Sequence, residues 1–262
     1  MANATYVYCV VASTRRPPIR VARGLPGTGR VRLIDVDRGL SIVAADAPLS
    51  RYGERAINLG LSKVEWVSRA AVAHEVVVES FINSAAAILP MKLFTIFKSD
   101  ERAAAHVRLQ RPRIDALVER VAGHHEWSVR VVMDRRLAGP PSDRRRTGVS
   151  PGTRRAAAAG AAFLARKKAR RDAAQELAIG ARKTVAALYD RLTARARLAR
   201  RRGASELPVA GGPLLLDAAF LIPRGRTASF RQLARREARA LARQGYALTL
   251  TGPWPPYSFV QD

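Results

Sequence analysis

Residues 246–260 read YALTLTGPWPPYSFV, a stretch that joins a regular strand pattern to a run of aromatic residues and prolines. Apolar residues alternate at Tyr246, Leu248 and Leu250, which is typical of a half-buried strand. The prolines at 253, 255 and 256 each lack an N–H group, so the strand cannot continue in a ladder with donors on both sides. The pattern predicts that regular strand pairing stops at these prolines.

The prolines also influence how the aromatic side chains of this stretch are presented. Each proline pushes the preceding residue toward extended or polyproline II geometry, in which three residues make one turn. Trp254 and Tyr257 would then share one face and, with Phe259, offer a contact surface to a partner. Two alternatives stay open: these residues cover their own sheet, or Pro253 to Pro256 form a Pro-x-x-Pro ligand.

Upstream of this stretch, strand and helix patterns alternate. EWSVRVVMD (126–134) and LLLDAAFLIP (214–223) predict strands. Residues 156 to about 202 are rich in Ala, Arg and Leu without proline, which predicts a long helix with the stripe Leu177, Ala181, Val185, Leu188 and Leu192. A second helix from Thr227 would turn inward Phe230, Leu233, Ala234, Ala238 and Leu241. The β-α-β-α-β order predicts an α+β sheet of ferredoxin-like type with its helices on one face.

The first half of the chain predicts a separate α+β domain. YVYCVV (6–11) predicts a strand, and residues 31–46 predict two strands that turn at 37–39. We place the boundary so that residues 1–124 form an N-terminal domain and 125–262 a C-terminal one. Within the latter, about residues 135–155 are rich in Pro, Gly, Ser and Arg and predict a basic linker.

Two helices are expected in the N-terminal domain. Ser62 and Glu65 have the spacing of a capping box and predict a helix that Pro90 ends. Its apolar stripe would be Val64, Val67, Ala71, Val78, Phe81 and Ala85. MKLFTIFKSD (91–100) predicts a strand, and Ser99 predicts the start of a helix that Pro112 splits or kinks. That helix carries the stripe Ile114, Leu117, Val118 and Val121, with Gly123 as its C-cap.

Charge is the strongest compositional signal of the chain. Its 262 residues include 46 Lys and Arg against 21 Asp and Glu, for a net charge of +25 and a pI near 11.6. Such a surface attracts polyanions, which indicates nucleic acid first and acidic proteins second. The alternative is a compositional bias that only keeps the surface solvated. A single Cys9 excludes an internal disulfide and fits a reducing cytoplasm, and neither a signal peptide nor a membrane span is expected.

Several motifs come close to a chemical site without completing one. GLPGTGRV (24–31) has the glycine spacing of a P-loop, but Arg30 and Val31 replace the lysine and the hydroxyl residue, so we interpret it as a turn. The fragments His74-Glu75 and His124 to Glu126 lack the second histidine of a zincin motif. His74 is best interpreted as a hydrogen-bonded core or interface histidine, and Cys9 as a structural thiol. The sequence predicts no catalytic constellation, no cofactor and no metal.

Segments along the whole chain resemble those of a known family. The ending LTLTGPWPPYSFV (248–260) is similar to the hallmark C-terminus of the gas vesicle protein GvpL/GvpF family. The segments YVYCVV, WVSRAAVAHEVVVE (66–79), ILPMKLFTIF (88–97), EWSVRVVMD and GAAFLARKKAR (160–170) resemble family segments in the same order.

The resemblance implies a non-enzymatic gas vesicle protein, either a minor structural component or an assembly factor. It also implies two α+β domains, the C-terminal one a modified ferredoxin-like sheet, and a location at gas vesicles in the cytoplasm. The expected partners are the small shell protein and accessory vesicle proteins, with no small-molecule substrate and no membrane. The candidate interaction residues are Trp254, Pro255, Pro256, Tyr257, Phe259, Trp66 and His74. An Arg-rich regulator that binds nucleic acid is the alternative function.

Overall fold

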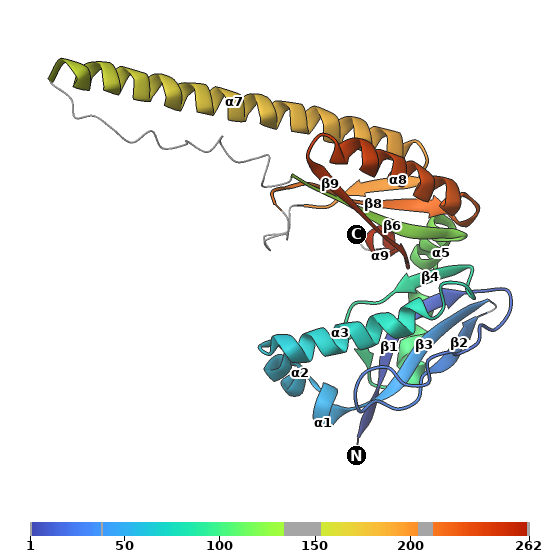
Figure 1. Ribbon diagram of the computed structural model, residues 1–262. Coiled ribbons are helices and arrows are strands. Elements are labelled where there is room, and N and C mark those ends of the chain that lie inside the picture. Colours follow the sequence, from blue (N-terminus) through green and yellow to red (C-terminus); the bar gives the residue numbers. More distant parts are fainter. Residues whose placement is uncertain (1, 38, 134–152, 204–211, 261–262) are drawn as a thin grey trace. The chain divides into compact units, whose positions relative to one another are not determined.

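The computed structural model describes residues 2–37, 39–133, 153–203 and 212–260 (Figure 1). The chain divides into two compact units. The first unit comprises residues 1–127, 221–227 and 252–262, and the second comprises 128–220 and 228–251. The split near residue 127 lies close to the expected boundary at 124, but two later segments group with the first unit. The expected linker at about 135–155 lies outside the described residues as far as residue 152.

The first unit contains an antiparallel sheet in the order β2-β3-β1-β4, with β5 also paired to β1. Its strands are β1 (Asn3–Ala12), β2 (Arg32–Asp37), β3 (Leu40–Pro48), β4 (Ala87–Pro90) and β5 (Ile96–Phe97). The predicted first strand and hairpin are confirmed. Gly39 occupies the turn with a φ of 76°, a conformation that glycine adopts without a steric cost.

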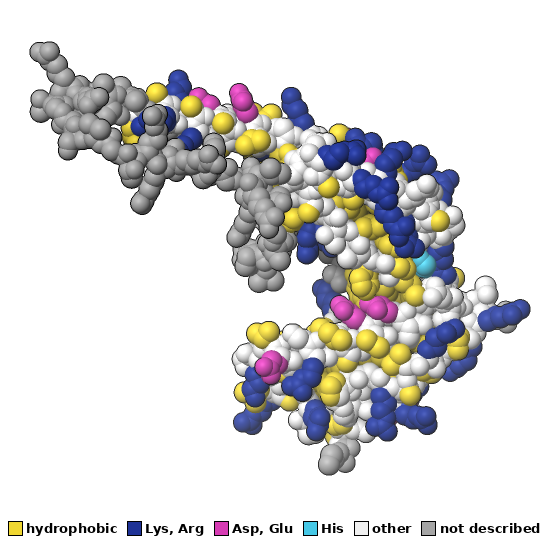
Figure 2. Space-filling model, viewed as in Figure 1, with side chains coloured by type: hydrophobic (Ala, Val, Ile, Leu, Met, Phe, Trp, Pro, Cys, Tyr) yellow, Lys and Arg dark blue, Asp and Glu magenta, His cyan; other side chains and the backbone are white. Residues whose placement is uncertain are grey.

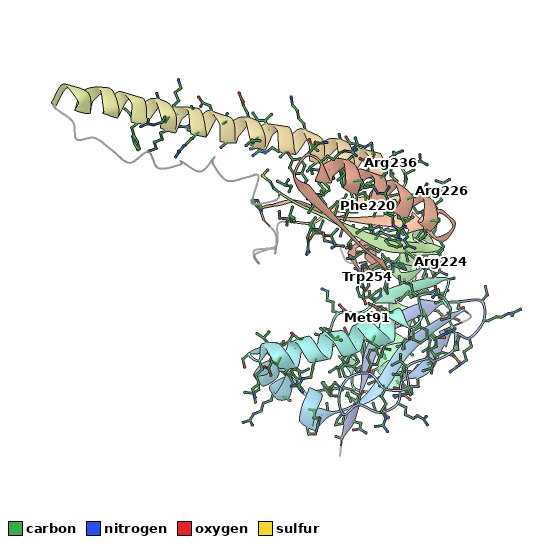
Figure 3. The ribbon with its side chains drawn as sticks, viewed as in Figure 1. Met91, Phe220, Arg224, Arg226, Arg236 and Trp254 are labelled. Atoms are coloured by element: carbon green, nitrogen blue, oxygen red, sulfur yellow. The ribbon has the colours of Figure 1, made fainter. Side chains whose placement is uncertain are left out.

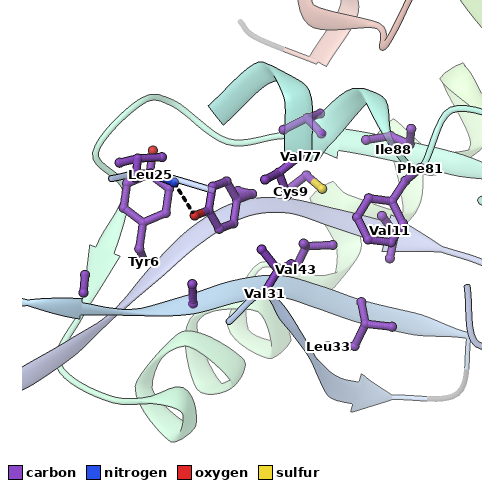
Figure 4. Packing of buried hydrophobic residues seen from close by; sticks show 14 of the residues in the cluster. Tyr6, Cys9, Val11, Leu25, Val31, Leu33, Val43, Val77, Phe81 and Ile88 are labelled. Carbon is purple, nitrogen blue, oxygen red and sulfur yellow. Dashed lines mark hydrogen bonds between the residues drawn. The ribbon is translucent and has the colours of Figure 1, made fainter. Parts of the chain in front are cut away.

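Strand β1 is buried along both faces and contains a bulge. Val7 pairs with Ala44 and Cys9 pairs with Val43, so Tyr8 is an extra residue in the ladder. The bulge places Tyr8 and Cys9 in one hydrophobic cluster although they are adjacent in sequence (Figure 4). Cys9 is fully buried, and burial raises the pKa of its thiol well above the usual range. These facts fit the structural role expected for Cys9.

Residues 24–31 form a turn, as we expected from the incomplete P-loop pattern. The Thr28 N–H donates to the Leu25 carbonyl at 3.1 Å. Arg23 and Arg30 form an isolated antiparallel bridge at the base of the turn. The Leu25 N–H donates to the Tyr8 hydroxyl at 3.1 Å, the bond drawn dashed in Figure 4. These bonds attach the turn to the buried strand β1.

The helices of the first unit are α1 (Leu49–Tyr52), α2 (Glu54–Leu61), α3 (Val64–Glu79), α4 (Asp100–Leu109), α5 (Arg111–Val121) and α9 (Tyr257–Val260). The predicted start of the second helix at Ser99 and its break at Pro112 are confirmed, while the C-cap is Ala122 and not Gly123. The Ser99 side chain accepts a hydrogen bond from the Arg102 N–H, and Pro112 lies at the start of α5 and separates it from α4. Ile114, Leu117 and Val121 are buried, while Val118 is only partly buried.

The predicted first helix differs from the structure in its extent and its buried face. Helix α3 ends at Glu79, and the segment before Pro90 forms strand β4. The buried face of α3 consists of Ala70, His74, Val77 and Val78, whereas Val64 at the head of the predicted stripe is exposed. Apolar residues line more than one side of this helix, so their spacing alone did not identify the side that packs on the sheet.

The second sheet has the strand order β7-β8-β6-β9. Its elements in chain order are β6 (His124–Met133), α7 (Thr153–Thr193), β7 (Leu198–Arg201), β8 (Leu214–Pro223), α8 (Thr227–Ala242) and β9 (Tyr246–Trp254), with a 3₁₀ turn at Arg224–Arg226. The order β-α-β-β-α-β is that of ferredoxin-like folds, and the α+β class is confirmed. The short β7 was missed, because its residues continue the Arg-rich composition of the long helix.

Both helices of the second unit pack on one face of its sheet. Phe220 of β8 contacts the rings of Tyr189 from α7 and Phe230 from α8, at centroid distances of 5.6 and 5.8 Å. Figure 1 shows α7 and α8 on the same side of the sheet. The predicted α7 stripe is confirmed at its buried members Ala181, Val185, Leu188 and Leu192, while Leu177 is exposed. Every residue from 163 to 180 is exposed, so this part of α7 is a solvated arm. No described helix is long and apolar enough to cross a membrane.

Candidate protein-interaction surface

Helices α2 and α3 of the first unit carry a group of exposed apolar side chains. Leu59, Leu61, Val64, Val72 and Val76 are 47–78% exposed. Val64, Val72 and Val76 are separated by eight and four residues, so they follow one side of α3. Figure 2 shows hydrophobic side chains along this helix. Single exposed apolar residues are ordinary, but several of them on two neighbouring helices are typical of an interaction site. The exposed side chains of Glu65 and Glu75 lie on the same side of α3 as Val64, Val72 and Val76. We call the five apolar residues the α2–α3 surface.

The turn between α2 and α3 depends on a close contact between Gly60 and Trp66. A Cβ atom at residue 60 would lie 2.6 Å from two carbons of the Trp66 ring. The Lys63 N–H donates to the Gly60 carbonyl at 2.9 Å, and α3 begins at the next residue. The predicted capping box does not form, because Lys63 is the N-cap and the Ser62 hydroxyl donates to the Leu59 carbonyl instead.

Gly60→Ala is therefore expected to destabilise the first unit by about 1–2 kcal/mol, because the clash with Trp66 outweighs the gain in helix propensity. Chemical denaturation would measure this loss. Gly180→Ala in the exposed arm of α7 is the matched control, because a Cβ there meets no atom within 4 Å. That control should be neutral or slightly stabilising. Equal stability of the two variants would contradict the packing role of Gly60.

Aromatic rings pack against one another next to the α2–α3 surface. Trp66 stacks on Phe94 with centroids 5.0 Å apart, and Tyr52 lies 6.3 Å from Trp66. Phe94 has a φ of 65°, an uncommon conformation for a bulky residue. A pocket of about 420 Å³ next to these rings is lined by Tyr52, Leu59 and Trp66 together with Arg51, Lys63 and Arg69. The pocket combines an apolar wall with cationic side chains, which suits an apolar partner segment with acidic neighbours.

His74 lies beneath the same helix in a buried polar network. The Phe94 N–H donates to the Tyr6 hydroxyl at 3.3 Å, and that hydroxyl lies 2.7 Å from His74 Nδ1. If Tyr6 donates its proton to Nδ1, the proton of the neutral ring is on Nε2. Nε2 is buried and makes no hydrogen bond of ordinary geometry among the described residues, while the nearby Met91 backbone offsets part of the effect of burial on the pKa of His74. Burial lowers the pKa of His74 to about 4, so the ring is neutral at pH 7.

The C-terminal stretch packs into the first unit as a closing element. Phe259 and Val260 of α9 are buried, at 5% and 8% exposure. Ser258 donates from its N–H and its hydroxyl to the two carboxylate oxygens of Glu126, at 2.7 and 2.8 Å. Glu126 is only 2% exposed, so these bonds form inside the unit. The expected polyproline II display of Trp254 and Tyr257 is replaced by a strand end at Trp254 and a short helix from Tyr257.

The predicted interaction residues fall into two groups. His74, Pro255, Pro256 and Phe259 are buried, and their side chains pack within the folded chain. Trp66, Trp254 and Tyr257 remain partly exposed, and Figure 3 labels Trp254 at the end of β9. The exposed residues of α2 and α3 other than Trp66 were missed as candidates. A signal was present in the apolar residues on more than one side of α3. Val64 was assigned to the core stripe, and Val72 and Val76 were left outside it.

Among the described residues, no group of three or more His, Cys, Asp and Glu side chains is placed to hold a metal ion. The buried ionisable groups described above are engaged in packing and hydrogen bonds. The first unit also presents to solvent the five apolar residues of the α2–α3 surface, with a small pocket beside them. The two antiparallel sheets with their covering helices and this surface define an α+β protein whose candidate site suits contact with another protein.

Comparison with known proteins identifies the family. The family described as "Gas vesicle synthesis protein GvpL/GvpF" matches residues 4–261, and the chain belongs to it. The chain is 26% identical over 223 residues to Gas vesicle protein L of Streptomyces sp. (strain CB03234), covering 84% of this chain and 79% of that protein. The resemblance stated from the sequence is confirmed.

Two solved structures share the fold of this chain. The crystal structure of the gas vesicle protein GvpF from Anabaena sp. PCC7120 matches with a TM-score of 0.66 and 17% identity, covering 99% of this chain and 97% of that one. The crystal structure of GvpF from Microcystis aeruginosa matches with a TM-score of 0.64 and 17% identity, covering 99% of both chains. At this identity the matches establish the fold.

Proposed function

We propose that this gas vesicle protein is an assembly factor that acts by contact, without catalysis, in the cytoplasm. Its partners would be the small shell protein and accessory vesicle proteins. The exposed α2–α3 surface carries the proposal, because these five apolar side chains stay in water unless another molecule covers them. Family membership supports the proposal, because it places the chain among gas vesicle synthesis proteins.

The proposed physical role is to shield apolar strands of the shell protein before they pack. Unpaired hydrophobic strand edges aggregate, and a partner that covers them keeps the protein available for assembly. The α2–α3 surface would supply the apolar contact, and Trp66 would line the pocket that receives a side chain of the shell protein. Trp254 and Tyr257, which remain partly exposed, are proposed as additional contacts.

The test compares binding to the shell protein by full-length variants. Leu59→Glu combined with Val72→Glu should weaken binding by about tenfold or more, because two apolar contacts are lost and two charges are desolvated. The matched control is Ile19→Glu combined with Leu109→Glu, which changes two exposed apolar residues of the same unit outside α2 and α3. Pull-down at low and high salt measures the binding, and light scattering measures aggregation of the shell protein.

Binding through the α2–α3 surface should persist at high salt, because apolar contacts are not screened by ions. The control pair should bind as the unchanged chain does. Equal losses in the two pairs would show that the α2–α3 surface has no special role. Shell protein that aggregates at the same rate with and without the chain would reject the shielding role itself.

A further inference from the structure

The outer side of α8 in the second unit carries a row of arginines. Arg231, Arg235 and Arg239 of α8 follow one another at four-residue spacing, Arg243 comes directly after the last residue of the helix at the same spacing, and all four are exposed. Residues at this spacing lie on one side of a helix and rise about 6 Å from one to the next. Figure 2 shows Lys and Arg side chains gathered over α8, and Figure 3 labels the neighbouring Arg236. We call these four residues the arginine row.

The positive charge of the arginine row is not neutralised by exposed acidic residues of α8. Glu237 is the one acidic residue in α8, and its side chain is buried. Its carboxylate already accepts a hydrogen bond from Arg191 at 2.8 Å, and Arg236 approaches it at 3.6 Å. Like charges four residues apart weaken a helix, so the row costs α8 stability in isolation. An anionic partner aligned with the row would convert this repulsion into attraction.

A hollow next to the row gives such a partner a place to lie. Its volume is about 940 Å³, and its lining includes Ala228 and Leu233 together with Arg195, Arg231, Arg235 and Arg239. The apolar residues and the arginines therefore line the same hollow. No aromatic side chain lines it among the described residues. A single-stranded nucleic acid would be expected to use aromatic rings for base stacking.

We propose that the arginine row and its hollow bind an acidic, amphipathic helix of a partner protein. Acidic residues repeated every fourth position on that helix would have the same rise as the arginines. Its apolar side would cover Ala228 and Leu233, while its carboxylates would pair with the row. This surface differs in chemistry from the α2–α3 surface, and the proposal does not depend on shell protein binding.

The test uses the full-length chain and a labelled synthetic peptide of about 20 residues, long enough to form a helix. The peptide carries Glu at every fourth position and Leu and Ala on the neighbouring side. A second peptide has the same composition in a permuted order that destroys the acidic row. Single-stranded and duplex DNA of matched length are the competing probes. Fluorescence anisotropy at low and high salt measures the affinity for each probe.

The variant that tests the row replaces Arg231, Arg235, Arg239 and Arg243 with Glu. The same four changed to Gln form a milder variant that removes the charge without reversing it. The matched control replaces Arg166, Lys167, Lys168 and Arg171 of the exposed α7 arm with Glu. The control and the reversed row have the same net charge. A difference in binding between these two variants therefore reports a local binding site and not the general attraction of the basic chain for anions. Thermal unfolding checks that each variant is folded.

We expect the row peptide to bind about tenfold or more tightly than the permuted peptide, with binding that weakens as salt rises. Reversal of the row should abolish this preference, and the Gln variant should reduce it. The arm control should keep the affinity within about threefold, because only long-range attraction changes. Equal binding of the two peptides, or equal losses in the row and arm variants, would overturn the proposal. DNA that binds more tightly than the row peptide and is lost with the row would assign the site to nucleic acid instead.

Discussion

Phe259→Ala is expected to lower the free energy of unfolding of the first unit by about 3–5 kcal/mol, the usual cost of truncating a buried phenylalanine. Phe259 is 5% exposed and belongs to the short helix α9, which Ser258 attaches to the buried Glu126. Removing the ring would leave a cavity beneath α9, and this helix has only four residues with which to stay packed on the first unit. The expected result is a large loss of stability at a residue close to the end of the sequence.

Urea denaturation of the full-length chain, with hydrogen exchange to assign the loss to the first unit, would measure this effect. Leu164→Ala on the exposed arm of α7 is the control, and a change within about 0.5 kcal/mol is expected there. A Phe259→Ala variant as stable as this control would show that α9 does not close the first unit.

The same packing changes how a C-terminal truncation should be interpreted. Removing residues 252–262 would take away α9 together with the Ser258 bonds to Glu126. A truncated chain that fails to bind the shell protein could therefore have lost the fold of the first unit. Trp254→Ala is the sharper test of a contact role for the tail, because Trp254 is partly exposed and α9 stays in place.

Acidification from pH 6.5 to pH 4 is expected to cost the chain about 3 kcal/mol of stability through His74 alone. Burial lowers the pKa of His74 from 6.5 to about 4 in the folded state. Between these two values the unfolded chain binds the proton and the folded chain does not, so protons favour unfolding. The contribution of His74 is fully present above pH 6.5 and is lost as the pH falls toward 4.

Denaturant unfolding at several pH values between 4 and 7.5 would measure the slope. His125 contributes with the same sign, because burial also lowers its pKa. His74→Gln separates the two, because glutamine does not titrate in this range and can still accept a hydrogen bond from Tyr6. The variant should be less stable at pH 7 and show a shallower slope. An unchanged slope in His74→Gln would mean that the buried network does not set the acid response.

Salt distinguishes the two proposed surfaces in one set of measurements. Contact through the apolar α2–α3 surface should persist as ionic strength rises, whereas binding to the arginine row should weaken. A partner that binds both surfaces would lose part of its affinity when the salt concentration is raised. It would lose the rest of its affinity when Leu59→Glu and Val72→Glu are introduced as well. The salt-sensitive binding therefore tests the arginine row, and the salt-resistant binding tests the α2–α3 surface.

The candidate site was only partly predictable from the sequence. Trp66 was identified from a segment that resembles the family, and it lines the pocket of the first unit. Val72 and Val76 were not identified, because an apolar residue on a helix is equally consistent with core and surface. The side of α3 that packs against the sheet is the side with His74, whose ring reaches the Tyr6 hydroxyl. Because Tyr6 and His74 are far apart in the sequence, no local sequence pattern predicts their hydrogen bond.

Sequence patterns were sufficient to predict the family, the α+β class, most strands and the limits of several helices. These features depend on short-range physics: alternation in β9, the Ser99 cap of α4 and the break at Pro112 each involve residues within a few positions of one another. Only the three-dimensional structure shows that Pro255, Pro256 and Phe259 of the tail are buried while Trp254 and Tyr257 stay partly exposed. Ser258 donates to Glu126, which is 132 positions away in the sequence. The hydrophobic effect depends on the apolar area that is buried and not on which segments bury it, so contacts between distant segments leave no periodic pattern in the sequence.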